Sequence, residues 1–172
     1  MSDRDSEYVE FVETMGPRLR RTAYLICGDW HRAEDAVQEA LYKLYLSWAK
    51  VDRAGNPAAY ARRVVVNTTL DGRRRPWHRE VPTETLPDQA AAGDPAGAHA
   101  ARDELGAVLA GVPPRQRACV VLRYYEDLSI EQTAEILGCS AGTVKSQAAR
   151  GLDTLRHALA QLRSVDRVAQ GE

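Results

Sequence analysis

Arginine side chains are concentrated between residues 61 and 79, where six occur against one acidic residue, Asp71. Guanidinium groups neutralise phosphates, and the nearby aromatic rings of Tyr60 and Trp77 can stack on unpaired bases. Basic residues near a helix end can also serve only to complement the helix dipole, but six arginines exceed what one dipole needs. The composition therefore favours a surface that binds nucleic acid.

A second pattern typical of nucleic-acid binding covers Ser129 to Leu155. Ser129 followed by Gln132 is a capping box that begins a helix, and Gly138 can adopt the positive φ that ends it. Ser140 can cap the next helix. Two helices separated by so tight a turn predict a helix-turn-helix, whose second helix normally enters the DNA major groove.

Residues typical of catalysis form no recognisable constellation in the 172-residue chain. It has no glycine-rich phosphate loop, no cysteine or histidine pair with metal-ligand spacing, and no histidine beside a paired nucleophile. We therefore expect no enzyme, no metal and no cofactor. Three widely spaced cysteines, Cys27, Cys119 and Cys139, favour buried, reduced thiols.

Charge is distributed unevenly along the chain, although the formal net charge is only −1. A net charge so close to zero argues against a simple histone-like DNA-binding protein. An acidic stretch from residue 80 to 104 offsets the arginine cluster, so the net charge hides basic surfaces separated by an acidic one. The N-terminus is charged, and no apolar run approaches the length of a membrane span. We expect a cytoplasmic protein without membrane insertion.

Helical periodicity predicts an all-α protein of two small domains. In the first domain, residues 1–79, Gly16-Pro17 interrupts a segment from Ser6 to Ile26 and leaves two helices or one kinked helix. Asp29 and Asn56 can cap two further helices. Residues 80–98 hold three prolines and two glycines, which predicts a flexible linker. The second domain, residues 99–172, begins with a helix from His99 to Leu109, and Pro113-Pro114 begins another.

Three separated segments resemble one family, the extracytoplasmic-function sigma factors, which are minimal sigma-70 proteins that direct RNA polymerase to promoters. The first is the D-x-x-Q-E core of Asp35 to Ala40, and the second is Val65-Val66-Asn67-Thr68. The third runs from Pro113 through the helix-turn-helix to Ser146. The segment that begins at Asn56-Pro57 and the arginine-rich end resemble the SigE-type group common in actinobacteria.

The resemblance implies two surfaces on the first domain. Periodicity alone is also consistent with a merely solvated polar face on the helix after Asp29, but in the family this face binds a coiled coil of the polymerase. The polymerase-binding residues would be Asp35, Gln38 and Glu39. The helix after Asn56 would recognise and open the minus-ten element, with these residues in contact with DNA: Tyr60, Arg62, Arg63, Asn67, Arg73 and Arg74. Many relatives carry Trp where this chain has Tyr60.

The second domain would read the minus-thirty-five element through the second helix of the motif. The residues that match the family's DNA-contacting positions are Arg115, Thr143, Lys145, Ser146, Gln147, Ala149 and Arg150. Arginine and glutamine can contact guanine and adenine edges in a bidentate manner. Ala149 is small where some relatives carry a bulky residue, so the base preference of those relatives is not assigned to this chain.

The partners implied are core RNA polymerase, through its β′ and β subunits, promoter DNA, and an anti-sigma factor as regulator. The alternative is a two-domain transcription regulator with a LuxR-like helix-turn-helix, which would bind operators as a dimer. The N-terminal half favours the sigma factor, because the alternative has no need of Asn67 and the arginine surface.

Overall fold

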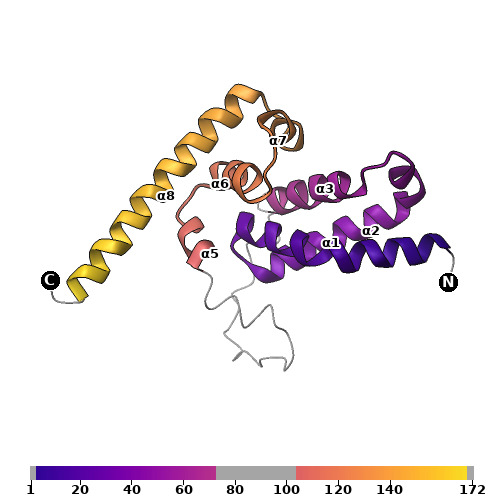
Figure 1. The fold of residues 1–172 in the computed structure, drawn as a ribbon, viewed down its shortest axis with the longest axis horizontal. Helices are drawn as coiled ribbons and strands as arrows, with labels where there is room; N and C mark the ends of the chain where they lie inside the picture. Colours follow the sequence, from indigo (N-terminus) through magenta and orange to yellow (C-terminus); the bar gives the residue numbers. More distant parts are fainter. Residues whose placement is uncertain (1–2, 73–103, 170–172) are drawn as a thin grey trace.

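The computed structural model describes residues 3–72 and 104–169, with side chains up to residue 165, and every regular element in these ranges is helical (Figure 1). The N-terminal group consists of α1 (Asp3–Cys27), α2 (Trp30–Arg53) and α3 (Pro57–Asp71). The Asp29 carboxylate accepts a hydrogen bond from the Arg32 amide, and the Asn56 side chain accepts one from the Ala59 amide. Both predicted caps are confirmed.

The C-terminal group begins with α5 (Glu104–Leu109) and α6 (Pro114–Val120). The chain continues from α6 into a single π-helical segment, η2 (Val121–Tyr125), and then into α7 (Ile130–Leu137) and α8 (Ala141–Ala169). In Figure 1, α8 runs along the outer side of the molecule, and its last turns extend away from the other helices. The all-α prediction is confirmed for the described residues.

Two helices differ in extent from the sequence-based expectation. Helix α1 is one continuous element with Pro17 inside it, which decides between the one-helix and two-helix alternatives. The second helix of the helix-turn-helix does not end near Leu155 but continues to Ala169. The predicted linker, residues 80–98, and the start of the helix predicted from His99 lie outside the described residues, so the domain boundaries stay predictions.

Buried apolar side chains of both helical groups belong to one hydrophobic cluster. Leu19, Leu25 and Val65 contribute from the first group, and Val121 and Leu122 contribute from the second. Helices α6 and η2 contact α1, and α7 contacts α3. The polar sites therefore lie on two helical groups that are packed directly against one another.

Candidate nucleic-acid and partner interfaces

The polar face of α2 carries the three residues predicted to bind the polymerase. Asp35 and Gln38 are exposed, whereas Glu39 is half-buried and forms an ion pair with Lys43 at 2.6 Å. The opposite face is fixed in the core by buried alanines and Val37. A cavity of roughly 150 Å³ lies between this face and the end of α3, lined in part by Arg32, Asp35 and Glu39. The face thus combines exposed acceptors with a hollow that a partner side chain could enter.

Helix α3 presents the residues predicted to contact the minus-ten element. Pro57 occupies its first turn, and the Asn56 cap fixes where the helix begins. Arg63 is exposed, Asn67 is half-buried, and Tyr60 packs partly against the core. Arg73 and Arg74 lie outside the described residues. The structure therefore brings four of the six predicted residues onto one helix.

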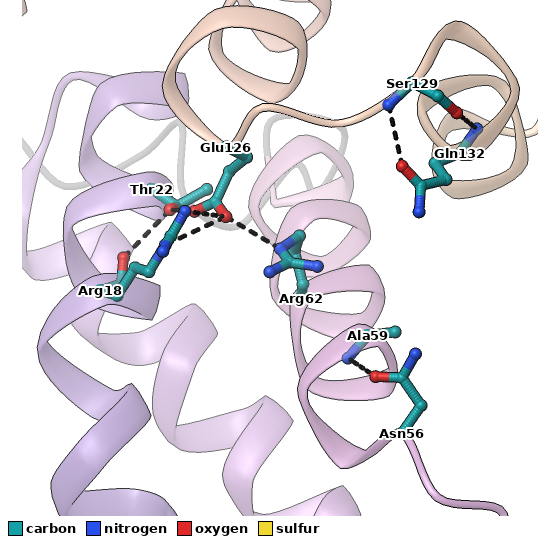
Figure 2. A network of polar contacts seen from close by, with 8 residues as sticks. All are labelled: Arg18, Thr22, Asn56, Ala59, Arg62, Glu126, Ser129 and Gln132. Atoms are coloured by element: carbon teal, nitrogen blue, oxygen red, sulfur yellow. Dashed lines mark hydrogen bonds and ion pairs between the residues drawn. The ribbon is translucent and has the colours of Figure 1, made fainter.

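Arg62, one of these four, is held by a residue of the C-terminal group. Its Nε donates to Oε2 of Glu126 at 3.0 Å, and only 16% of its side chain is exposed. Arg18 of α1 donates to the same oxygen at 3.2 Å, and the Thr22 hydroxyl donates to Oε1 (Figure 2). The Glu126 side chain is 1% exposed. Sequence reasoning did not single out Glu126, Arg18 or Thr22.

The helix-turn-helix has the geometry that its sequence predicts. The Ser129 hydroxyl accepts from the Gln132 amide at 3.0 Å, and the Gln132 side chain accepts from the Ser129 amide at 2.8 Å (Figure 2). Gly138 ends α7 with a φ of 61°. The Ser140 hydroxyl accepts from the Thr143 amide at 3.1 Å and so caps α8. Buried Val144 and Ala148 anchor α8 beneath its exposed face.

The residues predicted to contact the minus-thirty-five element share the start of α8. Lys145, Ser146, Ala149 and Arg150 are exposed. Arg115, at the start of α6, lines a small hollow together with half-buried Thr143 and Gln147 of α8. All seven predicted residues thus lie on α8 or close to it.

The described residues include neither a metal-binding cluster nor a membrane-spanning helix. No group of three or more histidine, cysteine or carboxylate side chains in them could hold a metal ion. None of the helices described is both long enough and apolar enough to span a bilayer. Cys119 is buried, as predicted, but Cys27 and Cys139 are only half-buried, because each lies at a helix end rather than under a packed face.

Two family matches coincide with the two helical groups. Residues 11–79 match sigma-70 region 2, and residues 102–155 match sigma-70 region 4. The chain is also 42% identical over 153 residues to the RNA polymerase sigma-E factor of Streptomyces avermitilis, covering 89% of this chain and 85% of that protein. This chain belongs to the extracytoplasmic-function sigma factors.

Other relatives of this sigma factor agree with that assignment. The ECF RNA polymerase sigma factor SigE of Mycolicibacterium smegmatis is 34% identical over 160 residues, covering 88% of this chain and 61% of that protein. The sigma factor RpoE from Bartonella quintana, solved in complex with the anti-sigma factor NepR, has a TM-score of 0.68 at 23% identity, covering 90% of this chain and 97% of that one. That likeness shows the fold.

Proposed function

We propose that this chain acts in the cytoplasm as an alternative sigma factor, which joins core RNA polymerase and directs it to particular promoters. The observation that carries the proposal is that one chain contains both sigma regions, with an accessible polar face on α2 and an accessible recognition face on α8. The LuxR-like alternative is not favoured, because the N-terminal group matches sigma-70 region 2. The chain contributes binding and not catalysis.

The face of α2 suits a polymerase subunit with basic and polar groups. The exposed Asp35 carboxylate and Gln38 amide can form charge-assisted and neutral hydrogen bonds with a partner helix, while Glu39 borders the hollow between α2 and α3. Binding here would leave α3 and α8 to contact DNA. The β′ subunit is the partner we assign to this face, with β as a further contact of the holoenzyme.

The two DNA-binding helices would divide recognition between them. Asn67 of α3 can pair with the edge of a flipped base in the minus-ten element, and the arginines nearby contact phosphates. Exposed Arg150 and half-buried Gln147 of α8 can reach base edges in the minus-thirty-five major groove. The sigma factor RpoE from Bartonella quintana was solved in complex with the anti-sigma factor NepR. We extend this to an anti-sigma factor for the present chain.

In-vitro transcription tests the proposed function. Core polymerase from the same organism would be mixed with the purified chain and a promoter library, with a second sigma factor as the positive control. We expect transcripts that begin at a defined set of promoters only when the chain is present. The proposal is contradicted if no promoter yields transcripts under conditions in which the control sigma factor is active.

The polymerase-binding face can be tested with Gln38→Ala. Because Gln38 is exposed, the substitution should leave the fold intact and lower the affinity for core polymerase by about tenfold, the effect of losing one interface residue of roughly 1–2 kcal/mol. Lys50→Ala, at an exposed position of the same helix, is the matched control. If both variants bind core polymerase as tightly as the wild-type chain, Gln38 is only a solvated surface residue.

A further inference from the structure

The side chains of Arg18, Thr22 and Arg62 form an anion site that the chain occupies with its own carboxylate (Figure 2). Two guanidinium groups, from α1 and α3, converge on Oε2 of Glu126, and a buried hydroxyl donates to Oε1. Carboxylates and phosphates are both bound by converging guanidinium donors. The same three side chains could therefore bind a phosphate.

The Glu126 carboxylate connects the two helical groups. Glu126 follows the π-helix η2 and lies three residues before Ser129, the cap of α7. Its partners Arg18, Thr22 and Arg62 belong to the N-terminal group. A buried carboxylate is stable only while its charge remains paired, so this contact holds the start of the helix-turn-helix against α1 and α3.

Removal of Glu126 from this site would leave two positive charges beside a hydroxyl donor on the surface that carries the predicted minus-ten residues. Arg62 is itself one of those residues, and exposed Arg63 follows it on α3. A nucleic-acid strand that lies along α3 would place a backbone phosphate near the vacated guanidinium groups. The carboxylate and the phosphate then compete for one site.

We propose that the Arg18–Thr22–Arg62 site takes a backbone phosphate of the opened promoter strand, and that Glu126 occupies it in the free protein and so opposes DNA binding. This inference rests on the proposed sigma-factor function. It adds Arg18 and Thr22 to the DNA-binding residues and assigns Glu126 an autoinhibitory role. Engagement of the strand and separation of the two helical groups become one coupled step, because both require Glu126 to leave.

The test measures binding of the full-length chain to a short fluorescent oligothymidylate, since a phosphate contact needs no particular base. Glu126→Gln removes the charge and nearly preserves the shape, and it should raise the affinity about tenfold, the ratio expected for losing a charge-assisted contact that competes with DNA. Glu135→Gln is the matched control. Glu135 pairs with Arg63 of the other helical group at 3.8 Å, but its side chain is 75% exposed, so this substitution should change the affinity less than twofold.

The phosphate contact itself is tested by adding Arg18→Ala to Glu126→Gln and measuring affinity against salt concentration. One lost phosphate contact should reduce the slope of log affinity against log salt by about one. An unchanged slope would overturn the anion site. Equal affinities of Glu126→Gln, Glu135→Gln and the wild-type chain would overturn the autoinhibitory role. Glu126→Asp gives the same comparison, with a smaller expected rise, should Glu126→Gln fail to fold.

Transcription with core polymerase separates this inference from the proposed function. A wild-type chain that directs transcription, together with a Glu126→Gln variant whose affinity does not rise, contradicts only the present inference. A wild-type chain that directs no transcription contradicts the proposed function, whatever the variants bind.

Discussion

Arg150 is an exposed residue of α8 whose planar guanidinium can contact a guanine edge with two hydrogen bonds. If Arg150 reads a base pair as we propose, replacement by alanine should cost about 1–3 kcal/mol at that base pair and should relax selectivity there. Competition binding of holoenzyme to minus-thirty-five variants measures this effect. Arg156→Ala, at an exposed position further along the same helix, should leave selectivity unchanged. An equal loss by Arg150→Ala on every sequence would mean that Arg150 contacts only phosphate.

Cys119 is buried in α6, and desolvation raises the pKa of its thiol from 9.0 to about 11. The folded state therefore retains this proton to a higher pH than the unfolded state does, so the Cys119 contribution to stability declines as the pH rises from 9.0 toward about 11.

Iodoacetamide at neutral pH should modify half-buried Cys139 well before Cys119, as mass spectrometry of peptides would show. Equal rates at the two cysteines in the folded protein would contradict this burial.

Residue-level predictability differs sharply between local and distant contacts. The caps at Asp29, Asn56 and Ser129 each depend on a partner three residues away, so their sequence patterns predicted them correctly. The contacts of Glu126 join it to Arg18 and Arg62, which are 108 and 64 positions away. No periodicity or capping pattern marks a single acidic residue as buried, so these contacts are visible only in the structure.

Among the elements, α1 shows how packing can continue a helix through a local break signal. The predicted break at Gly16-Pro17 rested on the hydrogen bond that proline cannot donate. The apolar side chains Leu19, Leu25 and Ile26 are almost fully buried, and their packing stabilises α1 beyond that one lost bond. Leu152 and Leu155 of α8 are partly buried against the core, but beyond them α8 continues through exposed side chains such as Leu159, Leu162 and Val165, so packing does not account for its length.

Of the described glycines of α8, Gly151 lies closest to α6. A Cβ at this position would lie 2.7 Å from Val120 Cγ2 and 3.1 Å from the Gln116 carbonyl oxygen. Gly151→Ala should therefore lower the free energy of unfolding by about 1–3 kcal/mol, despite the better helix propensity of alanine. Gly142→Ala is the matched control on the same helix, because its nearest atom would be 3.9 Å away. It should stabilise the protein by up to about 1 kcal/mol in urea unfolding. A Gly151→Ala variant more stable than the wild-type chain would contradict this, because α6 and α8 would then accommodate the methyl group without any loss of stability.

At the scale of the whole molecule, the sequence predicted two helical groups but not their contact. Each group has its own periodic apolar faces, and these suffice to predict helices and a helix-turn-helix. These apolar faces do not predict that Leu19 of α1 and Leu122 of η2 belong to one cluster, because that depends on which helices pack together, and these helices are far apart in the chain. How the two groups are arranged could not be predicted from the sequence, and in the described residues they share one core.

Arg117 of α6 joins the two helical groups through its guanidinium. It is buried, and its guanidinium donates to the Ile26 carbonyl of α1 at 3.3 Å and to the Ala110 and Val112 carbonyls at 2.9 and 3.2 Å. Because of this shared core, the wild-type chain should unfold in one calorimetric transition. Arg117→Ala would leave the carbonyls of the buried residues Ile26 and Val112 without this donor, at a cost of about 3 kcal/mol, and should separate the transition into two. Exposed Arg115→Ala on the same helix should change stability by less than about 0.5 kcal/mol. Two transitions in the wild-type chain would contradict the shared core, because the groups would then unfold independently.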